Sequence, residues 1–185
     1  MPIAITDDHR TSRGDRLGLP DQAPKPRGRP QPARPARSAD QVNSEIRHLV
    51  WAFDVDGCLV DSLTGTSLRP GTLEVLGRLH EAGAIVLLWS AGGRDYAISR
   101  AAELRFAHLI DAVYAKEHRG ADGRWCTVNL PPEHQPDVFV DDWADEAPAT
   151  ARLVPVSPYI APNPHDRGLA PLLAELTAPP DLRDA

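Results

Sequence analysis

The sequence predicts an α/β fold, a doubly wound and mostly parallel sheet with helices on both faces. Short apolar runs alternate along the chain with segments of helical periodicity, which is the pattern of successive strand–helix–strand units. The run Leu49–Phe53 is unbroken and apolar, as expected of a strand buried on both faces of a parallel sheet. It stops at carboxylates and a glycine, and open α/β sheets bind their ligands at the carboxyl ends of such strands.

The first helix is expected between Pro70 and Gly83, residue types that favour the start and the end of a helix. Leu73, Leu76 and Leu79 recur at helical spacing and are expected to form its buried face.

The remaining elements continue the alternation. They are expected as a strand over 84–89, a helix over 94–106, and strands over 112–115, 137–140 and 153–156. Asp166 is expected to cap a last helix. Its buried stripe would be formed by Leu169, Leu172, Leu173 and Leu176.

Three regions differ in composition. Residues 1–47 are rich in proline and arginine and poor in apolar side chains, so they are expected to form a disordered N-terminal arm. Residues 48–178 are expected to form a catalytic domain, and 179–185 a C-terminal tail. The arm is interpreted as a solvated leader in preference to a nucleic-acid-binding arm or a ligand for proline-recognition modules.

Charge and cysteine content narrow the classes of partner. Through His48 there are nine Lys/Arg against six Asp/Glu, a net charge of +3; from Leu49 onward there are eleven against twenty, a net charge of −9. Nucleic acid is therefore not the favoured partner of the folded domain. Cys58 and Cys126 form no disulfide framework, and no apolar run suits a secretory signal or a membrane helix. A cytoplasmic protein with no membrane contact is expected.

Two carboxylates, Asp54 and Asp56, stand at the end of the first strand, and Gly57 indicates a sharp turn after them. At the end of a buried strand they repel each other and lose solvation, so they need a cation or a shared proton. A solvated loop or a calcium loop is the alternative; the calcium loop is disfavoured because no Glu follows at the required distance.

Polar side chains end four predicted strands, and in a parallel sheet these ends meet at one edge. They are Asp54 and Asp56, Ser90, Lys116, and Asp141 and Asp142. Alone, each has an ordinary structural explanation, such as a helix cap, a surface lysine or a solvated turn; together they suit one reaction.

The reaction is phosphoryl transfer to water. Asp54 is a candidate carboxylate nucleophile for phosphorus, and Asp56 a candidate general acid and base. Mg²⁺ suits the oxygen ligands that the aspartates offer. Ser90 and the turn amides of Ala91 and Gly92 are candidates for binding phosphate oxygens, with Lys116 adding positive charge.

The sequence resembles the haloacid dehalogenase (HAD) superfamily. The four ordered segments Asp54–Gly57, Leu87–Ser90, Lys116 and Val138–Asp142 are similar to its motifs I to IV. The resemblance implies a Rossmann-like sheet, a phosphatase with Mg²⁺ as cofactor, and a phosphorylated substrate.

The resemblance also assigns roles residue by residue. Asp54 matches the nucleophile and Asp56 the acid/base, while Ser90 and Lys116 match phosphate-binding positions. Asp142 matches the direct metal ligand, and Asp141 is expected to act in the second shell or through water. Together with Asp54 and Asp56, these two complete the expected metal-binding set.

The stretch from Asp56 to the helix at Pro70 and the stretch from Ser90 to Lys116 are both too short for a large cap domain. In this respect the sequence resembles the capless branch of the family. Such members often act on large substrates or close the site by forming oligomers. The loop 117–136 lacks paired zinc-ligand spacing, and its Trp125, like Trp143 after the late aspartates, could wall the cleft or cover the core. Two functional alternatives stay open, a 3′-phosphatase-like end-processing enzyme for nucleic acid and a non-catalytic binding or regulatory module.

Overall fold

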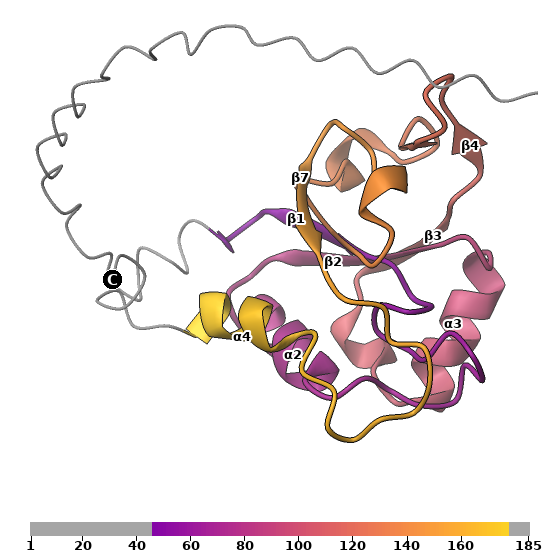
Figure 1. Cartoon of the computed structure of the whole chain (residues 1–185). Helices are drawn as coiled ribbons and strands as arrows, with labels where there is room; N and C mark the ends of the chain where they lie inside the picture. Colours follow the sequence, from indigo (N-terminus) through magenta and orange to yellow (C-terminus); the bar gives the residue numbers. More distant parts are fainter. Residues whose placement is uncertain (1–45, 178–185) are drawn as a thin grey trace, which may run out of the picture. The chain divides into compact units, whose positions relative to one another are not determined.

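The described part of the chain, residues 46–177 of the computed structural model, is built on a five-stranded sheet (Figure 1). Every neighbouring pair of strands is parallel, and the strand order is β3-β2-β1-β6-β7. The strands are β1 (Val50–Phe53), β2 (Ile85–Ser90), β3 (Ala112–Ala115), β6 (Val138–Asp141) and β7 (Arg152–Pro155). The chain starts in the centre, adds strands towards one edge and then towards the other, so the predicted doubly wound parallel sheet is confirmed. The predictions for the arm over 1–47 and the tail over 179–185 fall almost wholly outside the described residues.

Three α-helices of the described part lie together on one face of the sheet (Figure 1). They are α2 (Thr72–Glu81), α3 (Arg94–Glu103) and α4 (Ala170–Thr177). Their apolar side chains pack with Trp51 and Phe53 of β1 and with Val86 and Leu88 of β2 in one buried cluster. Two successive crossovers in the same direction place α2 and α3 on the same face, as right-handed connections require.

The opposite face differs from the expectation of α-helices on both faces. Its cover consists of a two-stranded hairpin, short 3-10 helices and loops, over a smaller apolar cluster that includes Trp89 and Phe139. The elements are β4 (His118–Arg119), β5 (Trp125–Cys126), η2 (Pro132–His134) and η3 (Ala144–Glu146); a further 3-10 turn, η1 (Ala107–Leu109), follows α3. Prolines at 131, 132 and 136 remove backbone donors there, so an α-helix cannot propagate.

The expected helices are present, with three corrections in detail. The helix expected over 94–106 ends at Glu103. On α2 the buried face is formed by Thr72, Val75, Leu76 and Leu79, whereas Leu73 is half exposed. Asp166 does not cap α4, which begins at Ala170; its carboxylate instead accepts the Nε–H of Arg69 at 2.6 Å and the backbone N–H of Gly168 at 2.9 Å.

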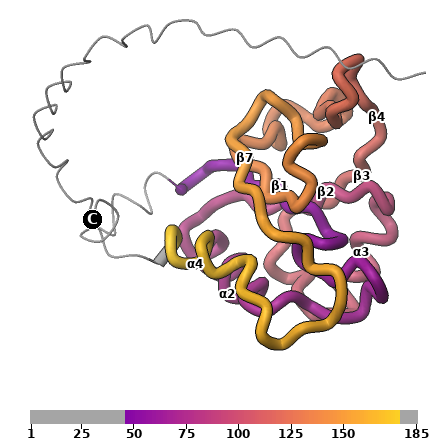
Figure 2. Tube along the Cα trace, viewed as in Figure 1, coloured from indigo at the N-terminus to yellow at the C-terminus, as the bar shows by residue number. Residues whose placement is uncertain are grey.

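The loop after β1 is held in place by the segment of the chain that follows β7. Figure 2 shows these two segments side by side, and the backbone N–H of Tyr159 donates to the Gly57 carbonyl at 2.7 Å. The buried Arg69 donates to the Cys58 carbonyl at 3.1 Å and to the Ser157 carbonyl at 2.7 Å. A Cβ at Gly168 would lie 1.8 Å from Arg69 Nη2, so this close approach requires glycine. The turn that carries Asp54 and Asp56 is therefore braced by buried hydrogen bonds.

Within residues 46–177, no helix has the length and apolar character needed to cross a membrane.

Candidate active site

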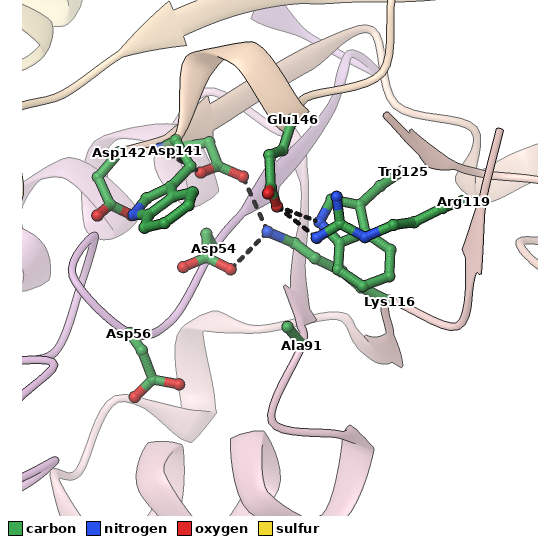
Figure 3. A pocket seen from close by; sticks show the side chains of 10 residues that line it. Asp54, Asp56, Ala91, Lys116, Arg119, Trp125, Asp141, Asp142 and Glu146 are labelled. Carbon is green, nitrogen blue, oxygen red and sulfur yellow. Dashed lines mark hydrogen bonds and ion pairs between the residues drawn. The ribbon is translucent and has the colours of Figure 1, made fainter. Parts of the chain in front are cut away.

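Three of the four predicted strand ends meet in a charged cluster at the carboxyl edge of the sheet (Figure 3). Lys116, directly after β3, places its Nζ 2.7 Å from Asp54 Oδ1 and 2.9 Å from Asp141 Oδ2. Oxygen atoms of Asp54, Asp141 and Asp142 all lie within 4.8 Å of one another. Because β1 pairs with β6, and β2 pairs with both β1 and β3, the sheet itself brings these distant residues to one edge.

Asp141 and Asp142 are adjacent in sequence but differ in how they are held. Both oxygens of Asp141 are engaged, since Oδ1 accepts the backbone N–H of Trp143 at 2.8 Å and Oδ2 accepts Lys116. Asp142 Oδ1 is buried and has no hydrogen-bond partner among residues 46–177. A Cβ at Gly57 would lie 2.5 Å from Asp142 Oδ2, so glycine at this turn lets the carboxylate approach the loop.

The cluster carries more negative charge than one lysine neutralises. Burial raises the pKa of Asp54 to about 7; Lys116 opposes this shift, and Asp141 adds to it. Burial, with the neighbouring Asp141, raises the pKa of Asp142 to about 6. Burial alone would lower the pKa of Lys116, but Asp54 and Asp141 outweigh it and raise that pKa. The lysine is therefore charged and the carboxylates are short of positive charge.

These carboxylates fit a divalent cation. Oxygen ligands bound to one Mg²⁺ at about 2.1 Å lie at most about 4.2 Å apart. Asp54, Asp141 and Asp142 each offer an oxygen, and these three atoms lie within 4.8 Å of one another. The orphaned Asp142 Oδ1 is a ligand atom without another role, and an added cation would offset the desolvation of Asp54. The donor set is all oxygen, which suits Mg²⁺ better than a softer metal.

The second strand end contributes less directly. Ser90 is fully buried, and its hydroxyl accepts the backbone N–H of Gly92 at 3.0 Å. Ala91 lines the cavity beside the acidic cluster, whereas Ser90 and Gly92 are not among its lining residues. A Cβ at Gly92 would lie 2.7 Å from the Tyr96 ring, so the turn packs tightly on the start of α3.

Asp56 lines the same cavity but its carboxylate turns away from Lys116 (Figure 3). Its Oδ1 accepts a short hydrogen bond from the hydroxyl of Tyr96 on α3. Burial and this bond raise the pKa of Tyr96, so the tyrosine stays a donor. Sequence reasoning missed Tyr96, because the contact spans 40 positions and depends on where α3 packs.

The outer wall of the cavity is formed by the second, loop-covered face. The cavity has a volume of about 280 Å³, and Trp125, Trp143, Arg119 and Glu146 line it together with the acidic cluster. Both tryptophans thus line the cavity, and Trp125 also packs against the apolar cluster of this face, so it fulfils both of the alternatives considered. Arg119 and Glu146 were not singled out from sequence, since isolated charges in a polar loop carry no pattern.

The two cysteines have different surroundings. Cys58 is buried, its thiol lies 3.5 Å from the Val140 carbonyl, and burial raises its pKa well above the usual value, so it stays protonated. Cys126 is partly exposed in β5.

Comparisons with known proteins give similarity at low identity. No protein-family model and no curated protein matches the sequence. A chain of the Pnkp1/Rnl/Hen1 complex is 14% identical with a TM-score of 0.45, covering 62% of this chain and 47% of that chain. This chain thus spans about half the length of that neighbour.

Two further solved structures are similar over most of their own length. An uncharacterized protein from Listeria monocytogenes serotype 4b is 14% identical with a TM-score of 0.42, covering 67% of this chain and 88% of that one. A 3-deoxy-D-manno-octulosonate 8-phosphate phosphatase from Moraxella catarrhalis, crystallised with magnesium, phosphate and KDO, is 12% identical with a TM-score of 0.39. It covers 74% of this chain and 90% of that one. Because these identities and TM-scores are low, the functional proposal rests on the geometry of the acidic cluster and not on these neighbours.

Proposed function

We propose that this protein is a Mg²⁺-dependent phosphomonoester hydrolase that works through an aspartyl-phosphate on Asp54. The observation that carries the proposal is the convergence of Asp54, Asp141 and Asp142 with Lys116 in the lining of one cavity. The resemblance of the same segments to the motifs of HAD phosphatases supports it.

In the first half-reaction a carboxylate oxygen of Asp54 attacks phosphorus, and the ester P–O bond breaks. Asp56 gives a proton to the departing alcohol oxygen. In the second half-reaction Asp56 takes a proton from water, whose oxygen attacks phosphorus and releases inorganic phosphate and free Asp54. The bond from Tyr96 holds one oxygen of Asp56 and leaves the other for this proton.

The positive groups around the nucleophile have separate tasks. Lys116 is 2.7 Å from Asp54 and is placed to stabilise charge on the phosphoryl oxygens. A bound Mg²⁺ would screen the approach of an anionic nucleophile to an anionic phosphate. Asp54 and Asp142 would hold it, while Asp141 orients Lys116. Ala91, which lines the cavity, would contact phosphate oxygens, whereas the Gly92 N–H is already bonded to the Ser90 hydroxyl.

The test is hydrolysis of an aryl phosphate with millimolar Mg²⁺. Wild type is expected to turn over and to lose activity with excess chelator. Asp54→Asn should lower kcat by at least about a thousandfold, because the amide is a poor nucleophile. Asp145→Asn, the same change at an exposed position of η3 outside the cavity lining, should keep wild-type activity. A wild type no faster than the buffer blank, or an Asp54→Asn variant with full turnover, would contradict the proposal.

A further inference from the structure

The cavity has a second part that the phosphatase chemistry does not use. Trp143 follows Asp142 directly, lines the cavity and keeps 64% of its surface exposed. Its backbone N–H is bonded to Asp141 Oδ1, which fixes it relative to the acidic cluster. A large indole held open beside a reactive group can gain contact area when a ligand covers it.

A second flat surface lines the same cavity. The guanidinium carbon of Arg119 lies 4.0 Å from the centre of the Trp125 ring. Glu146 Oε2 accepts Arg119 Nη2 at 2.6 Å and Trp125 Nε1 at 3.2 Å, so one carboxylate holds both groups. In Figure 3 these three residues lie on one side of Asp54, and Asp142 lies on its other side. Because Glu146 neutralises Arg119, the pair offers a stacking surface more than a site for a second anion.

We propose that this outer part of the cavity binds a flat ring, and that the substrate is a small phosphomonoester whose alcohol carries such a ring, of about the size of a mononucleotide. The inference rests on the proposed phosphatase function and adds its substrate class. Flat rings stack on tryptophan and on the plane of an arginine side chain. The affinity gained by stacking does not depend on which ring is bound or on its substituents.

Size and charge favour a small substrate over a polymer. The cavity of about 280 Å³ is slightly smaller than the roughly 300 Å³ at which the usual range of ligand pockets begins. That volume suits a phosphoryl group with one ring system. From Leu49 onward the chain has eleven basic and twenty acidic residues, a net charge of −9, which disfavours a polyanion spread over the surface.

The test compares adenosine 5′-monophosphate with ribose 5-phosphate. In both esters the leaving group is a primary alcohol on ribose, so the reacting bond is the same. The two compounds differ in the flat adenine ring, which only the nucleotide carries. Wild type is expected to prefer the nucleotide about tenfold in kcat/KM. Trp143→Ala should reduce the preference to within about twofold, and Trp143→Phe should keep most of it, since it retains a stacking face. Leu73→Ala, an exposed residue of α2 outside the cavity lining, should leave both rates unchanged.

The outcomes separate the inference from the function on which it rests. Equal rates on both esters, or a preference that survives Trp143→Ala, would overturn the ring site and leave the phosphatase in place. A 5′-phosphorylated oligonucleotide hydrolysed faster than the mononucleotide, with steep salt dependence, would overturn the assignment of a small substrate. If neither ester is hydrolysed but the aryl phosphate is, the substrate assignment is overturned and the phosphatase proposal stands. If none of the three is hydrolysed, the phosphatase proposal fails, and calorimetry with adenosine 5′-monophosphate and ribose 5-phosphate decides the ring site. Nucleotide binding that Trp143→Ala weakens would support it, and equal or absent binding would overturn it.

Discussion

The face of the sheet under α2, α3 and α4 is covered by interlocking apolar side chains, whereas the opposite face is covered by loops held largely by polar ones. On the first face Leu76 and Leu79 are completely buried in a large cluster. On the second, the amide of Gln135 helps to hold the loop: its Nε2 donates to the carbonyls of Thr127 at 3.0 Å and Leu130 at 2.8 Å. The second face thus buries less apolar surface and depends more on individual hydrogen bonds.

This difference between the two faces assigns most of the stability of the fold to the helix-covered face and the outer cavity wall to the loop-covered face. The aspartates of the acidic cluster stand at strand ends that the helix-covered face braces, partly through the buried Arg69. The side chains that line the outer cavity, Trp125 and Arg119 among them, belong to the loop-covered face. Loops on a rigid scaffold can change without disturbing its core, so this arrangement allows the substrate to vary while the chemistry is kept.

The largest expected effect tests the two faces with the same truncation. Leu79→Ala removes a fully buried side chain from the helix-covered cluster and should lower the free energy of unfolding by about 3–5 kcal/mol. Leu130→Ala, in the smaller cluster under the loop, should lower it by about 2 kcal/mol or less, because the loop can relax into the space. Urea unfolding measures both. An equal loss at the two positions would mean that the faces contribute alike.

Acid should weaken the braced loop on the helix-covered side. Asp61 accepts backbone N–H groups from Thr64, Thr66 and Ser67 at 2.7–3.0 Å. Burial alone would raise its pKa, but these bonds outweigh it and lower the pKa below the usual value. The pKa of Asp166 is lowered as well, since the bond from Arg69 outweighs burial.

A lowered pKa in the folded state means that the unfolded chain takes up protons first as the pH falls. The stabilisation is therefore complete above about pH 4 and is lost as the pH falls through the folded pKa values. The raised pKa values of Asp54 and Asp142 act in the opposite sense between about pH 7 and pH 4, so urea midpoints should show this loss below about pH 4. Asp61→Asn should be less stable at pH 7 by about 1–3 kcal/mol and should show a shallower pH dependence. An unchanged slope would exclude Asp61 as a source of the acid sensitivity.

The sequence predicted the helix-covered face better than the loop-covered one, for physical reasons. The strand over Ala112–Ala115 was predicted with its observed bounds. Helical periodicity also predicted most of the α2 and α4 stripes, although Leu73 is half exposed. The helix predicted over 94–106 ends at Glu103, because the chain turns through a positive φ of 63° at Arg105, which no residue preference announces.

The site was predictable where single strands deliver a side chain to the edge, as with Asp54 and Lys116. It was not predictable where a contact depends on tertiary packing, as with Tyr96 on Asp56. The hairpin strands β4 and β5 have two residues each, too few to show alternation.

The smallest expected effect on stability comes from the ion pair at the cavity wall. Glu146 and Arg119 are partly exposed, so Glu146→Gln should change the free energy of unfolding by less than about 1 kcal/mol. Amide hydrogen exchange over residues 118–126 should nevertheless become faster, because Glu146 holds both Arg119 and Trp125.

The matched control is Glu175→Gln, which breaks a similar exposed pair with Arg152 at 3.1 Å, from α4 on the helix-covered face. It should leave exchange over 118–126 unchanged. If Glu146→Gln instead lowers the free energy of unfolding by more than about 2 kcal/mol, the hairpin belongs to the cooperative core. The loop-covered face could then not vary independently of the fold, and the separation of stability from recognition would fail.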